Sequence, residues 1–146
     1  MRKRKTWREK MNNPNLPKVV PRGAQTMLVP SPWEVDAYMR TVPKGSIATI
    51  TQMREFLAAK YAVDVTCPLT TGIFVHLASE VAEEEAAAGK KQISPYWRIV
   101  RSDGSLNPKF PGGVERQAER LRAEGHRILG GKNRVPFRVV VPGERT

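Results

Sequence analysis

The sequence has little of the chemistry that metal centres and disulfides need. Its one cysteine, Cys67, excludes an internal disulfide and a thiolate metal cluster. Its two histidines, His76 and His126, are too few and too widely separated in sequence to indicate a zinc site. We therefore expect neither a metal ion nor a cofactor.

Long apolar runs are also missing. No stretch approaches the length that crosses a bilayer, and the basic N-terminus is not followed by the apolar core of a signal peptide. The sequence therefore predicts a cytoplasmic, nucleoid-associated protein without a membrane partner. With 146 residues, 40% of them hydrophobic, we expect one compact core with tails, and a monomer.

Acidic residues are scarce relative to basic ones. There are 14 Asp and Glu against 25 Lys and Arg, which gives a net charge of +11. Residues 1–22 carry eight basic residues against Glu9 alone, a net of +7, so the rest of the chain carries +4. A balance of this kind favours a nucleic-acid partner, with a membrane surface as the weaker alternative.

The basic N-terminal residues are also interrupted. Asn12-Asn13-Pro14-Asn15, Pro17 and Pro21 stop any regular element from running far, so residues 1–26 are predicted to form a flexible arm. Such an arm is either a solubilising tail or a sequence-blind contact to phosphates. The sequence leaves both open.

Capping signals and apolar periodicity predict two short helices. Ser31, Pro32 and Glu34 have the pattern of a capping box, and Pro43-Lys44-Gly45 ends the first helix. The second helix is predicted over residues 51–61. Their expected buried faces are Trp33, Ala37 and Tyr38 in the first helix and Met53, Phe56, Leu57 and Ala58 in the second.

Two further helices are expected after these. One runs over residues 68–88, and its expected buried stripe is Leu69, Ile73, Leu77 and Val81, with Thr70, Thr71, Val75 and Ser79 on the opposite side. The start of a helix in a helix-turn-helix protein enters a DNA groove, and Thr70, Thr71 and Gly72 suit that approach. The last helix is predicted over residues 114–124, with Val114, Ala118 and Leu121 inward and Gly125 as its stop.

Short β elements are expected near the C-terminal half. Asp103-Gly104 is a turn signal, so a hairpin is predicted over residues 98–106. Residues 134–141 have the composition of a strand, which Pro136 restricts to an edge or to its own start.

One segment organises the rest of the chain. Pro95-Tyr96-Trp97-Arg98-Ile99, followed by Gly-Gly and a helix ending in Glu-Gly, resembles the active-site segment of the methylated-DNA–protein-cysteine methyltransferase family, which reads Pro-Cys-His-Arg-Val. The resemblance spans roughly residues 32–128. The frame residues that match are Pro95, Arg98, Ile99, Gly104, Gly112, Gly113, Glu124 and Gly125.

The residues that carry the family's chemistry are replaced. Tyr96 stands at the position of the nucleophilic Cys and Trp97 at that of the His. A phenol with an ordinary pKa near 10 is a poor nucleophile at neutral pH, and an indole accepts no proton. Ile50 and Leu69 replace the family's backbone-pressing Tyr and its finger Arg, and the family's supporting Asn is missing. The pattern is similar to that of alkyltransferase-like proteins, the relatives without the Cys.

The resemblance implies a mostly α-helical fold with a small β hairpin, a winged-helix-like (helix-turn-helix) DNA-binding domain over residues 27–130, with a C-terminal strand and tail over residues 131–146. It implies non-catalytic binding to double-stranded DNA, recognition of alkylated guanine, and DNA-repair proteins as further partners. The DNA contacts it predicts are Lys44, Thr49, Thr70, Thr71, Gly72, Arg98 and Arg101. The predicted pocket for an extruded base is lined by Ile50, Leu69, Tyr96, Trp97, Phe110 and Glu124.

Three alternatives stay open at this point. Leu69 is either an apolar wedge between base steps or a core residue. Cys67, just before the third helix, is either a buried thiol or the acceptor of a surviving alkyl transfer. The third alternative to specific DNA binding is that the chain is a protein-interaction module, which uses the acidic run Glu83-Glu84-Glu85 and residues 134–141.

Overall fold

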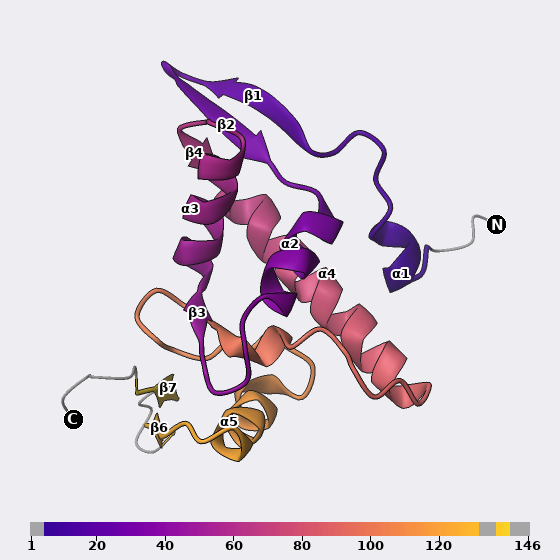
Figure 1. The fold of residues 1–146 in the computed structure, drawn as a ribbon, viewed down its shortest axis with the longest axis vertical. Helices are drawn as coiled ribbons and strands as arrows, with labels where there is room; N and C mark the ends of the chain where they lie inside the picture. Colours follow the sequence, from indigo (N-terminus) through magenta and orange to yellow (C-terminus); the bar gives the residue numbers. More distant parts are fainter. Residues whose placement is uncertain (1–4, 132–136, 141–146) are drawn as a thin grey trace.

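The structure is a computed structural model that describes residues 5–131 and 137–140 (Figure 1). The described residues form a mixed fold of five α-helices, one 3-10 turn and three small sheets. The helices are α1 (Trp7–Lys10), α2 (Pro32–Arg40), α3 (Ile50–Lys60), α4 (Pro68–Ala87) and α5 (Gly113–Ala123), and the 3-10 turn η1 covers Tyr96–Arg98. The strands are β1 (Lys18–Arg22), β2 (Gln25–Val29), β3 (Ala48–Thr49), β4 (Val65–Thr66), β5 (Ile99–Val100), β6 (Ile128–Leu129) and β7 (Arg138–Val139).

A β-hairpin forms from β1 and β2, in a stretch where the sequence did not predict one. β1 and β2 pair antiparallel around a turn at Gly23, and β2 continues the sheet by pairing in parallel with β4. The expectation of a flexible arm through residue 26 is wrong for this stretch. Pro21 is accommodated because β1 is an edge strand. Farther upstream, Met11 is buried, so this segment of the chain is held against the body.

α2 begins where its capping signal predicts, and α3 begins at Ile50, one residue before its predicted start. The Ser31 hydroxyl accepts from the Glu34 amide (3.2 Å), and Thr49 and Gln52 complete a reciprocal capping box on α3. The predicted buried faces are partly wrong, because Trp33 and Phe56 are exposed. The Trp33 indole N–H instead donates to the side-chain oxygen of Asn12 (2.9 Å), and the Phe56 ring rests on Tyr38 at the surface. Ala37 is exposed too, while Val35, Asp36, Met39, Met53, Leu57 and Ala58 are buried.

α4 has the predicted span but a different rotation. Leu77 and Val81 are buried as expected, whereas Leu69 and Ile73 face outward. Thr71, Val75 and Ser79, which were expected on the opposite side, are buried instead, together with Ala78 and Ala82. These side chains are mostly small, which lets α2 pack closely across α4. Strand pairing fixes this rotation, because the Cys67 amide at the start of α4 donates to the Leu28 carbonyl of β2 (2.8 Å).

The expected hairpin over residues 98–106 is also wrong. Asp103-Gly104 does form a turn, with Gly104 at φ +85° and its amide donating to the Arg101 carbonyl (2.8 Å). β5, however, pairs in parallel with β3, and the chain beyond the turn bonds to residues 137–139. The predicted C-terminal strand is present only as the two residues of β7, paired with β6; Phe137 and Val140 flank it without strand structure, and residues 134–136 and 141 lie outside the described ones.

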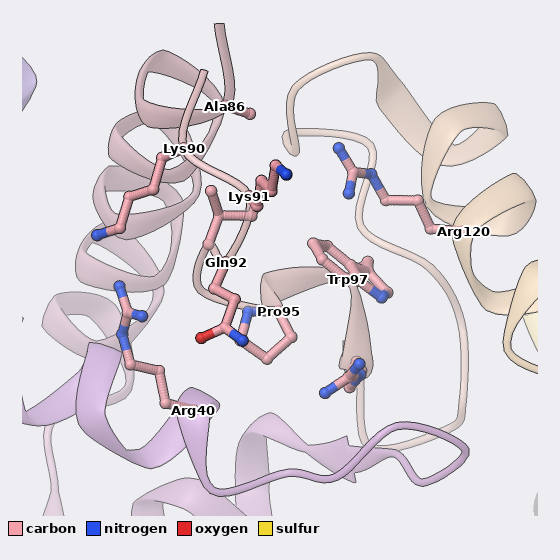
Figure 2. Close-up of a pocket in the computed structure, with 10 residues that line it drawn as sticks. Arg40, Ala86, Lys90, Lys91, Gln92, Pro95, Trp97 and Arg120 are labelled. Atoms are coloured by element: carbon pink, nitrogen blue, oxygen red, sulfur yellow. The ribbon is translucent and has the colours of Figure 1, made fainter. Parts of the chain in front are cut away.

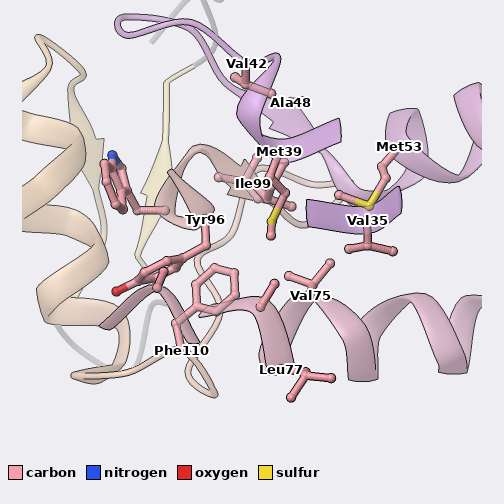
Figure 3. Packing of buried hydrophobic residues seen from close by; sticks show 14 of the residues in the cluster. Val35, Met39, Val42, Ala48, Met53, Val75, Leu77, Tyr96, Ile99 and Phe110 are labelled. Carbon is pink, nitrogen blue, oxygen red and sulfur yellow. The ribbon is translucent and has the colours of Figure 1, made fainter. Parts of the chain in front are cut away.

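The core lies where α2, α4 and the η1–β5 segment meet. Figure 3 shows Tyr96, Phe110 and Ile99 beside Met39 and Val75 in one cluster. β1–β2 and β4 lie at the end of the molecule where α4 begins, and α5 with β6–β7 lies at the other end (Figure 1). Within the described residues, no helix combines the length and apolar character needed to cross a membrane.

Candidate nucleic-acid interface

The first turns of α4 present an uncovered face. Leu69 and Ile73 are 73% and 53% exposed, and Gly72 lies between them, since residues three and four apart are neighbours on a helix. A Cβ added at Gly72 would meet nothing within 4 Å, so no other part of the described chain approaches it. We call Leu69, Gly72 and Ile73 the α4 entrance face. Leu69 is therefore not a core residue.

An arginine lies beside the start of α4. The Nε of Arg54 in α3 donates to the Thr66 carbonyl (3.2 Å), one residue before Cys67. Residues 68–79 contain no Asp or Glu, whereas residues 80–85 contain four glutamates. The entrance of α4 is thus suited to an anion, with the helix dipole adding positive potential there.

The two threonines of the predicted contact differ. Thr71 is fully buried, and its hydroxyl donates to the Cys67 carbonyl (2.7 Å), so it cannot reach DNA. The prediction for Thr71 is wrong because α4 is rotated relative to the expected stripe. Thr70 is half-buried, and its hydroxyl lies 3.1 Å from the Cys67 sulfur at the edge of the entrance face.

Cys67 is the N-cap of α4. Burial raises the pKa of its thiol, but hydrogen bonds from Thr70, together with the backbone of Leu69 and the charge of Arg22, outweigh this and lower the pKa below its usual value. Its side-chain partner is the Thr70 hydroxyl, which is no general base at neutral pH. Among the described residues, the side-chain hydrogen-bond partner of Cys67 is thus not a base of the kind that activates a nucleophile.

We therefore expect no alkyl transfer to Cys67. Incubation of the protein with methylguanine-containing duplex, followed by intact mass measurement, should show no added methyl group. A free-thiol alkylating reagent on the same sample shows that the thiol was available. A mass increase of one methyl group, absent in Cys67→Ser, would contradict this expectation.

Of the residues predicted to line a base pocket, Tyr96, Trp97 and Phe110 pack against one another in the core, whereas Leu69 lies apart from them on the surface. Tyr96 and Phe110 are 1% and 3% exposed and pack edge to face in the core (Figure 3). The Tyr96 hydroxyl donates to Glu83 (2.6 Å). Leu69 lies 14 residues before Glu83 on α4, which places it about 21 Å away along the helix. Burial, then the hydrogen bond and charge of Glu83, raise the pKa of Tyr96, so it is no nucleophile.

Arg98 is held within the protein. Its Nε and one terminal nitrogen donate to the two carboxylate oxygens of Glu124 (2.9 and 2.7 Å), and the other terminal nitrogen donates to the Val42 carbonyl (2.8 Å). The side chains of Arg98 and Glu124 are 14% and 9% exposed. Burial raises the pKa of Glu124, but Arg98 outweighs it, with the indole of Trp97 acting in the same direction, and the pKa lies below its usual value. The guanidinium predicted to bind phosphate is thus committed to a structural ion pair.

Three of the remaining predicted contacts lie near one another. Thr49 and Ile50 are beside the segment that holds Arg101, because Thr49 pairs with Val100 and Thr51 hydrogen-bonds Ser102. Lys44 and Arg101 are exposed in loops, Thr49 caps α3 through its hydroxyl, and Ile50 is half-buried against the core. No three His, Cys, Asp or Glu side chains gather as a metal site would require within residues 5–131 and 137–140.

Gln117 was not singled out from the sequence. Its side chain is 1% exposed, its amide nitrogen donates to the carbonyls of Trp97 and Ile99 (both 3.0 Å), and its oxygen accepts from the Asn107 amide (2.9 Å). It therefore fixes both ends of the segment that resembles an active site. The only sequence signal is its place between Val114 and Leu121 on the inward side of α5.

Comparison with known proteins gives a limited result. No family model matches the chain, and no curated protein matches it in sequence. Among solved structures, the chain is similar to S. pombe Atl1, an alkyltransferase-like protein, in complex with damaged DNA containing O6-carboxymethylguanine. The TM-score is 0.48 and the identity 18%, over 76% of this chain and 89% of that one. A likeness this low does not assign a family.

Proposed function

We propose that the chain is a non-catalytic protein that binds double-stranded DNA through the start of α4. The observation that carries the proposal is the α4 entrance face, because Leu69 and Ile73 are exposed and Gly72 leaves the helix open to close approach. Glycine inside a helix costs about 1 kcal/mol relative to alanine. Nothing within the described chain offsets that cost, so an external surface that packs on Gly72 is its simplest use.

The chemistry around this face suits a duplex. Exposed Leu and Ile side chains can contact base edges and thymine methyl groups, or act as wedges between base steps. Arg54 lies beside the start of α4, where the rest of its guanidinium can reach phosphates. The four glutamates at the other end of α4 lie away from this contact.

A matched pair of variants tests this placement. Ile73→Asp puts a carboxylate on the entrance face, and Phe56→Asp puts one on an equally exposed apolar position of α3, 53% and 54% exposed respectively. Because the new carboxylate would meet phosphates, we expect duplex affinity to fall about 10-fold or more for Ile73→Asp and less than about 2-fold for Phe56→Asp. Fluorescence anisotropy measures both, with thermal melting as the folding check. Equal losses would reject this face.

Recognition of alkylated guanine is a separate part of the proposal. Tyr96 and Phe110 are packed in the core and leave no space for a base between them, so a lesion would have to be recognised at another part of the surface. Titration of matched duplexes with and without methylguanine tests it. Tighter binding to the modified duplex would support damage recognition and a role in assisting repair, while equal affinity would leave only general DNA binding.

The acidic end of α4 does not favour the interaction-module alternative. Glu83 accepts from Tyr96 and Arg120, and Glu85 pairs with Lys90 and Arg8. These carboxylates hold the protein together, so the acidic run is mostly an internal contact.

A further inference from the structure

A second charged site lies at the opposite end of α4. It is a cleft of about 640 Å³ between the end of α4, the loop that follows it, η1 and α5. Figure 2 shows Arg40 and Lys90 on one side and Trp97 and Arg120 on the other, with Lys91 between them. Together with Arg98, these cations and the Trp97 ring form most of its wall, and we call it the basic cleft.

Carboxylates outside the lining of the basic cleft form ion pairs with three of its cations. No Asp or Glu among the described residues lines the cleft, yet Arg40 is held by Asp36 (2.8 Å), Lys90 by Glu85 (2.8 Å) and Arg120 by Glu83 (2.7 Å). These carboxylates are between 8% and 28% exposed. They fix the cations in position and leave other N–H donors facing the cleft. Positioned donors of this kind bind an anion at lower entropic cost than free side chains do.

One lysine and one nitrogen of a paired arginine still lack a partner among the described residues. Lys91 makes no ion pair in the part of the chain that the structure describes. The Nε of Arg120 is buried and makes no hydrogen bond there. A phosphate oxygen would satisfy such donors, because guanidinium and ammonium groups both bind phosphate through charge-assisted hydrogen bonds.

The faces of the Trp97 ring are not free for a base to stack on. The Arg120 guanidinium lies 4.3 Å from its centroid, Arg98 lies 5.6 Å away, and Tyr96 packs against it edge to face. The residue is only 8% exposed. A base therefore cannot stack on this ring while Arg120 keeps its place, so the cleft recognises charge and not base identity.

The positive surface continues past Trp97. A smaller cleft of about 240 Å³ is lined by Lys44, Ala123 and Glu124 and shares Trp97 and Arg120 with the basic cleft. Glu124 is already paired with Arg98. The cations thus follow one another from Lys90 to Lys44, an arrangement that fits successive phosphates of a polymer better than a single small anion.

We propose that the basic cleft binds the phosphates of a nucleic-acid strand, independently of base sequence. It is separate from the α4 entrance face, because Ala86 at the cleft lies 13 residues beyond Ile73, about 20 Å along the helix. The protein thus has two nucleic-acid contacts, one at each end of α4. The cleft includes Lys90 and Lys91, which lie in the loop beyond the helix.

A charge-reversal pair tests the basic cleft. Lys91→Glu changes the cleft, while Lys109→Glu makes the same change at an exposed loop residue that lines no described cleft. The probe is a single-stranded oligonucleotide of mixed sequence, and we expect Lys91→Glu to weaken its binding about 10-fold. The slope of log affinity against log salt concentration should become shallower by about 0.7 for each phosphate that the variant no longer neutralises. Lys109→Glu should stay within about 2-fold of the parent chain. Equal effects of the two changes would overturn the proposal.

Further arms separate this proposal from the function proposed above. If the parent chain binds duplex and Lys91→Glu matches Lys109→Glu on both single strand and duplex, the basic cleft is rejected and the entrance face stands. Single-strand binding that depends on Lys91, without duplex binding, supports the cleft and rejects the proposed duplex function. Binding to inorganic pyrophosphate but not to the oligonucleotide would overturn the polymer assignment. Binding to none of these probes rejects both sites.

Discussion

Replacing Arg98 with methionine is expected to destabilise the folded chain by about 3 to 5 kcal/mol, which is the usual cost of breaking a buried ion pair by removing one partner. The substitution leaves Glu124 as an uncompensated carboxylate that is 9% exposed, and it also leaves the Val42 carbonyl without its donor. Methionine keeps much of the arginine volume, so a cavity contributes little. Urea unfolding at neutral pH measures the loss.

The double variant Arg98→Met/Glu124→Met separates the stranded charge from lost packing. We expect it to be more stable than Arg98→Met alone, because replacing both members of a buried pair by apolar groups is often close to neutral. A double variant that is as unstable as the single one would show that the charge is not the cause.

The same ion pair gives an expected pH dependence. The pKa of Glu124 is lower in the folded chain than its ordinary value, near 4.3, so the pair stabilises the fold fully above that value. This contribution is lost as pH falls through the lower folded pKa. The stability gap between the parent chain and Arg98→Met should therefore be widest at neutral pH and narrow near pH 3. A gap independent of pH would contradict the role given to the Glu124 carboxylate.

Replacing Gln117 with leucine is the second change with a large expected effect. Leucine fills a similar volume but leaves two carbonyl oxygens and the Asn107 amide without partners in a site that is 1% exposed. Each unsatisfied buried group costs about 1 to 3 kcal/mol, so we expect a loss of at least about 3 kcal/mol. Chemical denaturation measures the loss, and amide exchange should report faster opening around Trp97, Ile99 and Asn107.

Gln117→Glu keeps the shape of the side chain and changes only its hydrogen-bonding groups, so it is the matched control for Gln117→Leu. It keeps an oxygen for the Asn107 amide, but its second oxygen would face the Trp97 and Ile99 carbonyls. Burial and these carbonyls should raise the pKa of the new carboxyl, so the variant should gain stability as pH falls below that pKa. If Gln117→Leu and Gln117→Glu respond identically to pH, hydrogen bonding by this side chain does not explain its effect.

Local signals in the sequence predict much of the secondary structure. Ser31 caps α2, Pro68 begins α4, and Asp103-Gly104 forms its turn. These features depend on residues a few positions apart, which is why the sequence alone can place them. The hairpin β1–β2 was missed because basic and proline-containing segments resemble flexible tails, and its stability comes from pairing with the distant β4.

The rotation of α4 shows the limit of periodicity. Leu69, Ile73, Leu77 and Val81 have helical spacing, and so does the set that begins with Thr71 and Val75. Both sets fit an amphipathic helix, and the small side chains of the second set are the ones that α2 covers. The choice depends on the packing partner and not on the spacing. Tertiary packing also decides which side chains line a cavity. The sequence therefore predicted a base pocket that the fold does not form, and it did not reveal the basic cleft, whose walls come from α2, α4, η1 and α5.

The most direct test of DNA binding is a salt-dependent titration of the parent chain with duplex DNA. With a net charge of +11 and an open α4 entrance face, the chain should bind an unmodified duplex at low salt. The logarithm of the affinity should fall linearly with the logarithm of salt concentration, with a slope of about −0.9 for each phosphate that the protein neutralises. Absence of duplex binding at low salt would contradict the proposed function.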